Sequence, residues 1–208
     1  MRRQRAHLLL LLLWSLAGLA GCGDSNDDPD DGFSVTYAKG TARIRCSGGD
    51  CAVGVVFDGG FANVGGTRTV DGVPTTRFLL LTQLTNVEIE TGAGDDHVQM
   101  VDTFIPGTVR IATGPGDDHF DLCDASAAGD TSIDAGDGDD DVSIGPGAYG
   151  RQLRVHAGAG DDVVRLQSLF VRGDLRADGD DGVDEVNITN ATFEEGVAIQ
   201  SFERRPFD

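Results

Sequence analysis

The sequence predicts an all-β fold: a right-handed parallel β-solenoid of about six coils with an N-terminal β cap. Two observations predict it. A glycine–aspartate motif recurs every 22 residues, and the apolar residues between its copies keep the same positions in each repeat. Constant apolar positions at a constant interval are typical of proteins in which each repeat stacks on the one before. The chain has 208 residues, 30 glycines and 39% hydrophobic residues, which is enough apolar material for one folded domain.

The repeated motif is Gly-x-Gly-Asp-Asp, and its four intact copies begin at residues 92, 114, 136 and 158. One further step of 22 reaches Gly182 and Asp184, where the motif is degenerate but keeps its glycine and its last aspartate. Glycine and aspartate favour turns and oppose helix. The motif therefore predicts one turn in each coil.

The apolar residues after each motif alternate with polar ones and form four columns. The first two are Val98, Phe120, Val142, Val164, Val186 and Met100, Leu122, Ile144, Leu166, Ile188. The second two are Val109, Thr131, Leu153, Leu175, Val197 and Ile111, Ile133, Val155, Ala177, Ile199. Alternation with a period of two predicts strands with one buried face. Extended backwards, the pattern places Val87 and Ile89 in the second pair of columns and Phe78 in the first.

These patterns assign residues 73–205 to the solenoid. Residues 33–72 contain strand-like runs without the repeat, and we assign them to a cap because the first coil of a solenoid needs its open edge covered. Cys46 and Cys51 enclose a four-residue loop, which predicts a disulfide in an oxidising compartment. A zinc site is the alternative, but no second Cys or His pair lies nearby. Cys123 falls in a strand and is expected to be a free thiol.

Residues 1–21 have the composition of a signal peptide. Arg2, Arg3 and Arg5 precede an apolar run that is too short to span a bilayer. The run ends in Leu-Ala-Gly-Cys22, which resembles a bacterial lipoprotein signal. The resemblance implies cleavage before Cys22 and lipidation of its side chain and amino group. An ordinary secretory signal is the alternative.

Residues 22–32 then form a lipid anchor and an acidic tether with five aspartates. The glycine after Cys22, where inner-membrane lipoproteins of enteric bacteria carry aspartate, favours the outer membrane. We therefore expect the lipid to hold the protein in the periplasmic or the surface-exposed leaflet of that membrane.

The motif aspartates form two neighbouring columns: Asp96, Asp118, Asp140, Asp162, Asp184 and Asp95, Asp117, Asp139, Asp161. Stacked coils place equivalent residues about 4.8 Å apart. Two carboxylates at that distance repel by about 1 kcal/mol in water and by roughly 3–4 kcal/mol at an effective dielectric constant near 20. Carboxylates together with the carbonyl oxygens of glycine turns are ligands that Ca²⁺ prefers, so the columns predict bound Ca²⁺. Turn-capping aspartates that face water without metal are the alternative.

The motif resembles the nonapeptide (RTX) calcium-binding repeat, Gly-Gly-x-Gly-x-Asp-x-U-x, from its second glycine onward. The resemblance implies that Asp96, Asp118, Asp140 and Asp162, and Asp184 in the degenerate copy, hold Ca²⁺ together with backbone carbonyls. This chain departs from that family because it has 22 residues per coil and one aspartate-lined edge instead of tandem nonapeptides with two such edges.

Charge narrows the range of functions. With 35 acidic and 16 basic residues the net charge is −19, which excludes nucleic acid as a partner. We expect a monomeric, lipid-anchored structural or adhesion module of the cell envelope without enzymatic activity, able to contact a surface polysaccharide or protein.

The alternative is a carbohydrate-active lyase or hydrolase that uses an outward column of Arg110, Arg154 and Arg176. Asp134, His156 and Asp178 lie two residues beyond this column on their strands. Cross-coil ion pairing would also explain these residues. His97 and His119 either bind a transition metal or are solvated turn histidines.

Overall fold

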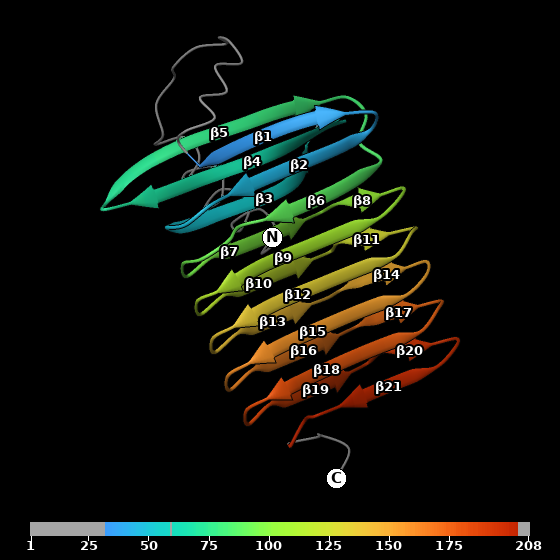
Figure 1. The fold of residues 1–208 in the computed structure, drawn as a ribbon. Helices are drawn as coiled ribbons and strands as arrows, with labels where there is room; N and C mark the ends of the chain where they lie inside the picture. The colour runs from blue at the N-terminus through green and yellow to red at the C-terminus, as the bar shows by residue number, and fades with distance from the viewer. Residues whose placement is uncertain (1–31, 59, 204–208) are drawn as a thin grey trace, which may run out of the picture.

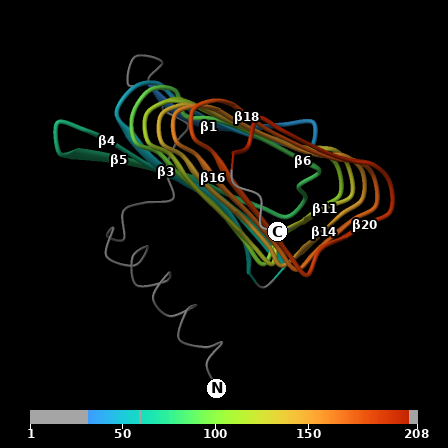
Figure 2. The ribbon, with the colours of Figure 1, turned by 90° about the horizontal axis from the view of Figure 1, so that it is seen from below.

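The computed structural model describes residues 32–58 and 60–203, which are built entirely from strands and turns. Its strands form three sheets that wind into a three-sided parallel β-solenoid of about five turns with a spacing of about 22 residues (Figures 1 and 2). The structure thus confirms the predicted fold class, with regular turns somewhat fewer than expected. No helix in the described ranges is long and apolar enough to cross a membrane.

The first sheet, sheet A, has eight strands, in the spatial order β1 (Phe33–Ala38), β2 (Thr41–Cys46), β6 (Asn86–Glu90), β9 (Val109–Pro115), β12 (Thr131–Asp137), β15 (Leu153–Ala159), β18 (Leu175–Asp181) and β21 (Val197–Gln200). Sheet B also has eight, in the order β19 (Glu185–Thr189), β16 (Val163–Gln167), β13 (Asp141–Ile144), β10 (His119–Cys123), β7 (His97–Val101), β3 (Asp50–Asp58), β4 (Phe61–Val70) and β5 (Val73–Leu81).

Sheet C is a short five-stranded sheet that the sequence analysis missed. Its order is β20 (Thr192–Phe193), β17 (Leu169–Val171), β14 (Gly147–Tyr149), β11 (Ser126–Ala127) and β8 (Phe104–Ile105). Its inward column, Ile105, Ala127, Tyr149 and Val171, is fully buried and recurs every 22 residues. The strands have only two or three residues, too few for alternation to be recognised. The 22-residue recurrence of this inward column was the one feature of the sequence that could have indicated sheet C.

The four predicted apolar columns are confirmed by the strand register. Val98, Phe120, Val142, Val164 and Val186 are consecutive partners in sheet B, and Val87, Val109, Thr131, Leu153, Leu175 and Val197 are consecutive partners in sheet A. Most of these side chains are buried, and together they fill the interior of the solenoid. Only in the last coil does the column open to solvent, where Val197 is 48% exposed.

The cap differs from the expected boundary. Val53 and Val55 on β3 pair with Val98 and Met100, and thus take the place that the sequence pattern gave to Phe78. Phe78 instead lies on β5, is 62% exposed and belongs to an antiparallel hairpin with β4. This hairpin projects beyond the aspartate turns (Figure 2), and its insertion lengthens the spacing between partners from 22 to 45 residues. Regular stacking therefore begins at β6 and not at residue 73.

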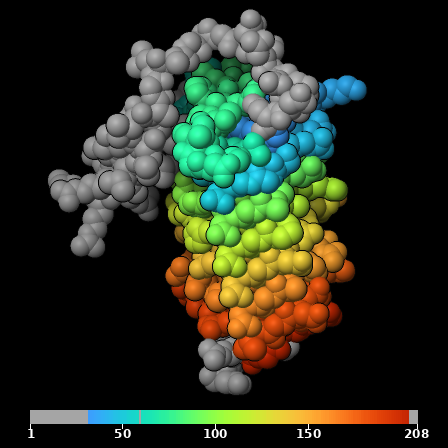
Figure 3. Space-filling view, turned by 60° about the vertical axis from the view of Figure 1, so that its left-hand side comes forward, coloured from blue at the N-terminus to red at the C-terminus, as the bar shows by residue number. Residues whose placement is uncertain are grey.

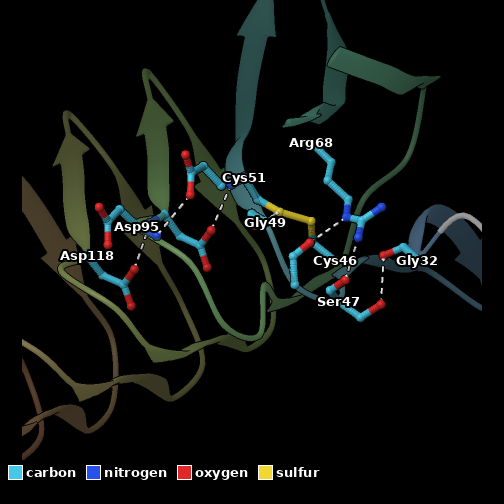
Figure 4. The surroundings of a disulfide bond; sticks show 11 residues. Gly32, Cys46, Ser47, Gly49, Cys51, Arg68, Asp95 and Asp118 are labelled. Atoms are coloured by element: carbon cyan, nitrogen blue, oxygen red, sulfur yellow. Dashed lines mark hydrogen bonds between the residues drawn. A yellow bond between two sulfur atoms is a disulfide. The ribbon is translucent and has the colours of Figure 1, made fainter. Parts of the chain in front are cut away.

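Cys46 and Cys51 are joined by a disulfide with their Cα atoms 6.7 Å apart. Figure 4 shows this bond at the point where the cap meets the first aspartate turn. The Arg68 guanidinium closes the same loop, because its Nε donates to the Gly48 carbonyl at 2.6 Å and its Nη2 to the Ser47 carbonyl at 2.8 Å. Cys123 is a free, half-buried thiol.

Two phenylalanines test the packing of the coils. Replacing Phe120, which is fully buried, with alanine removes a whole side chain from the interior and should cost about 3–5 kcal/mol of unfolding free energy. The same change at Phe104, which is 58% exposed, should cost about 0.5 kcal/mol or less. Thermal or urea unfolding measures both. Equal losses would contradict the assignment of the inward columns.

Candidate functional site: the aspartate turns

The Gly-x-Gly-Asp-Asp turns join sheet A to sheet B in each coil and stack along one edge of the solenoid (Figure 1). The two glycines have positive φ angles, for example +113° at Gly136 and +140° at Gly138. A Cβ atom at Gly138 would overlap the carbonyl oxygen of Gly116 in the neighbouring coil, so only glycine fits there. This close approach places the two aspartates of each turn directly against those of the next turn.

The second aspartate of each turn points inward. This inner column consists of Asp96, Asp118, Asp140, Asp162 and Asp184, all with 2% or less of their surface exposed. Each carboxylate accepts, through Oδ1, a hydrogen bond from the backbone N–H of the inner aspartate in the preceding coil, at 2.7–3.0 Å. The ladder ends in the same way at both limits: Asp96 accepts from the Cys51 N–H at 2.7 Å, and the Asp184 N–H donates to Glu203 at 2.8 Å.

The first aspartate of each turn points outward. This outer column consists of Asp95, Asp117, Asp139 and Asp161, and all four are exposed. Their hydrogen bonds run in the opposite direction, because each Oδ1 accepts from the N–H one coil further on, at 2.9–3.1 Å. Asp50 in the cap extends this column through a 3.4 Å contact with the Asp95 N–H. Each turn is therefore tied by side chains to the turns on both sides of it.

The second carboxylate oxygen of the inner column is unpaired. The Oδ2 atoms of all five inner aspartates are buried and have no hydrogen-bond partner in the described part of the chain. In the same turns, the carbonyl oxygens of Gly94, Gly116, Gly138 and Gly160 accept no N–H from the described residues. A buried polar atom without a partner costs about 1–3 kcal/mol, and more if charged. The buried Oδ2 atoms therefore require a proton or a cation, and the carbonyl oxygens beside them are free to accept from the same partner.

The pKa values of the inner aspartates also indicate that these carboxylates need a proton or a cation. The pKa of Asp140 is raised to about 8, chiefly by burial and in smaller part by the charges of Asp118 and Asp162, while the hydrogen bond from the Asp118 N–H opposes the shift. Burial likewise raises the pKa of Asp118 and of Asp162 to about 6. At the ends of the column burial also raises the pKa of Asp96 and of Asp184. Without a bound cation the row cannot be fully ionised near neutral pH.

The donor set fits Ca²⁺ in kind, since it combines carboxylate and carbonyl oxygens. Among the described residues no three His, Cys, Asp or Glu side chains converge on one point. In this ladder each gap between coils is flanked by only two inner carboxylates, so a cation held there would need backbone oxygens as its remaining ligands. The structure groups the five inner aspartates at buried positions, whereas the four outer ones face solvent. Sequence reasoning did not foresee that Oδ1 in both columns is used by a backbone N–H.

The other residues singled out in the sequence lie elsewhere. Arg110, Arg154 and Arg176 are exposed neighbours on the outer face of sheet A, away from the turns. On the same face His156 is held between two carboxylates, with Nδ1 3.1 Å from Asp134 and Nε2 2.9 Å from Asp180. Both ring nitrogens are thereby engaged, so His156 cannot act as a base toward a substrate while these contacts persist.

The two turn histidines lie side by side. The rings of His97 and His119 pack edge to face with their centroids 5.0 Å apart. Burial lowers the pKa of His97, and the neighbouring His119 lowers it further, while Asp121 opposes the shift. A neutral imidazole is thus favoured at His97.

The chain was compared with known proteins at three levels. It matches no protein-family model, no curated protein and no solved structure. Function must therefore be inferred from the residues of the aspartate turns.

The pKa shifts predict how stability depends on pH. Because the folded-state pKa values of the inner aspartates lie above the ordinary value of 3.8, protons favour the folded state. In the presence of a chelator, the melting temperature should be higher at pH 5 than at pH 8, because the stabilisation present below the ordinary pKa of 3.8 is lost progressively as the pH rises from about 4 to about 8. Calorimetry across this range measures it. A melting temperature that rises steadily from pH 5 to pH 8 in chelator would contradict the burial of these groups.

Proposed function

We propose that the protein is a calcium-stabilised β-solenoid that serves as a structural or adhesion module of the bacterial cell envelope. One observation carries the calcium assignment: five buried carboxylate oxygens in a single row have no hydrogen-bond partner among residues 32–58 and 60–203. The inner column, Asp96, Asp118, Asp140, Asp162 and Asp184, would supply the carboxylate ligands. The glycine carbonyls of the same turns would supply neutral oxygens.

Calcium would satisfy two needs of this architecture at once. A divalent cation beside two inner carboxylates cancels their mutual repulsion, and it also gives the unpaired Oδ2 atoms a partner. Both effects act across the gap between coils, so binding would stabilise the stack as a whole. The outer column, which is exposed and has its Oδ1 atoms hydrogen-bonded, would add negative potential that attracts the ion without contacting it.

The envelope location rests on the N-terminal segment. Residues 1–31, including Cys22, lie outside the described residues, so the lipoprotein signal remains a sequence-based assignment. The disulfide between Cys46 and Cys51 supports an oxidising compartment, because such bonds persist mainly outside the cytoplasm. A lipid on Cys22 would hold the solenoid at the outer membrane by a tether of acidic residues. Calcium concentrations outside the cell suit sites of modest affinity.

Calcium should raise the melting temperature of the purified protein. Binding to the folded state alone contributes about 2.7 kcal/mol for a site at 100 times its Kd, which corresponds to several degrees in a chain of this size. Differential scanning calorimetry with Ca²⁺ or with a chelator measures the shift. No response of the melting temperature to calcium would remove the metal assignment.

Adjacent aspartates provide a matched pair of variants. Asp140→Asn keeps the Oδ1 acceptor for the Asp118 N–H but removes an inner charge, so it should reduce the calcium-induced shift and stabilise the chelated protein at pH 8. Asp139→Asn makes the same change in the outer column and should leave the calcium response intact. A response lost in both variants would show that the outer column also binds the ion. A response kept in both would move the site elsewhere.

Two cysteine variants, Cys22→Ser and its control Cys123→Ser, test the lipid anchor. In a bacterial host supplied with labelled palmitate, Cys22→Ser should abolish incorporation of the label and release the protein from the membrane fraction. Cys123→Ser should change neither, because Cys123 is a half-buried thiol on β10. Membrane fractionation without detergent, followed by immunoblotting, gives the second readout. Label retained in Cys22→Ser would refute the anchor.

A further inference from the structure

The outer face of sheet A contains a hollow of about 510 Å³ that is distinct from the aspartate turns. It is formed by β6, β9, β12 and β15, where the outward side chains of neighbouring strands stand in one row. In that row Ser132 is the register partner of Arg110 on one side and of Arg154 on the other. The short serine side chain leaves space between two long cationic ones.

Four acidic residues also line this hollow, but each already has a partner. The contacts are Glu88 with Arg43 at 2.6 Å, Glu90 with its register partner Arg45 at 3.0 Å, Asp134 with His156 at 3.1 Å, and Asp130 with the backbone N–H of Gln152 at 3.3 Å. Arginines therefore neutralise Glu88 and Glu90, whereas Asp130 is only hydrogen-bonded and Asp134 shares His156 with Asp180. The hollow thus carries charges of both signs within a chain that is strongly acidic as a whole.

The two arginines of the hollow form no ion pair with the described residues, although Glu88 is the register partner of Arg110. Neither Arg110 nor Arg154 lies within ion-pair distance of a carboxylate in the part of the chain that the structure describes. Arg154 also has a like-charged register neighbour, Arg176, whose nearest carboxylate is that of Asp174 at 3.9 Å. Like charges directly opposite each other on a sheet repel. An anion beside Arg154 would relieve this repulsion.

The surroundings specify what kind of anion fits. A guanidinium offers only donors and matches the planar geometry of a carboxylate. The carboxylates at the rim can accept hydrogen bonds from hydroxyl groups, but they repel a doubly charged ligand such as phosphate. A molecule with one carboxylate and several hydroxyls satisfies both conditions. Sugar acids, either free or as units of an acidic polysaccharide, have this chemistry.

We propose that the hollow over Ser132 binds the carboxylate of a sugar acid between Arg110 and Arg154. The rim acids, including Glu90 and Asp134, receive hydrogen bonds from its hydroxyl groups. The site lies on the sheet face and is made without any inner aspartate, so it does not depend on calcium at the turns. It gives the module a specific ligand in addition to a stabilising ion.

Titration of the purified full-length protein with D-galacturonate, followed by NMR or calorimetry, tests the proposal. Binding is expected with a Kd of about 1 mM, as is usual for a single monosaccharide with few charged contacts. Galactose, which has the same ring without the carboxylate, should not bind. Binding of galactose equal to that of galacturonate, or tighter binding of phosphate, would overturn the assignment.

Three variants locate the site. Arg154→Gln removes one guanidinium, and Ser132→Gln fills the hollow without changing its charge; each should weaken galacturonate binding by about tenfold or more. Arg172→Gln is the control, because Arg172 lies outside the hollow, with its guanidinium 3.7 Å from Glu194. Circular dichroism checks that all three remain folded. Unchanged affinity in both Arg154→Gln and Ser132→Gln would refute the site.

A tetramer of galacturonate separates the two sources of the ligand. Tighter binding than the monomer supports a polysaccharide ligand that continues along the sheet face, and equal binding supports a free sugar acid. Both outcomes agree with the proposed chemistry. Repeating the titration with chelator separates this proposal from the calcium assignment, because loss of the calcium response would leave galacturonate binding to the folded protein unchanged.

Discussion

The hydrogen bond from a backbone N–H to the inner aspartate of the next coil is the constraint on which the structure depends. It occurs between every pair of adjacent motif turns, from Asp96 to Asp184, and it requires both coils to hold the same register. With the register fixed, the apolar columns of sheets A and B meet inside the solenoid. The same constraint forces five carboxylates into one buried row. Stacking and charge repulsion therefore have a single origin in this fold.

The cap and the C-terminal end continue this constraint where the repeat stops. On one side the Cys51 N–H occupies the place of a preceding coil, and Asp50 extends the outer column. On the other side Glu203 accepts from the Asp184 N–H. The Cys46–Cys51 disulfide holds the strand that starts the ladder, and the β4–β5 hairpin covers the edge of β3. The edge of β3 is thus covered at the cap, whereas at the other end β19, β20 and β21 are the last strands of their sheets.

The regular part of the fold could be predicted because its signal repeats. Val98, Phe120 and their equivalents keep one spacing, so the strand positions and their register follow from the sequence alone. The cap could not be derived in this way, since the inserted hairpin breaks the spacing and leaves Phe78 exposed although it fits the pattern. For the site, the sequence predicted the two aspartate columns. It could not show that Asp139 faces solvent while Asp140 is buried, because adjacent residues in a turn are distinguished only by the path of the backbone.

The buried row of Oδ2 atoms calls for cations beside the inner column. A crystal structure of the protein grown with Ca²⁺, with the ions identified by anomalous scattering, would locate them. We expect a row of calcium ions along the turns, in contact with Asp118, Asp140 and Asp162. Turns free of calcium at saturating concentration, or ions bound only at the exposed outer column, would show that calcium does not satisfy the buried carboxylates.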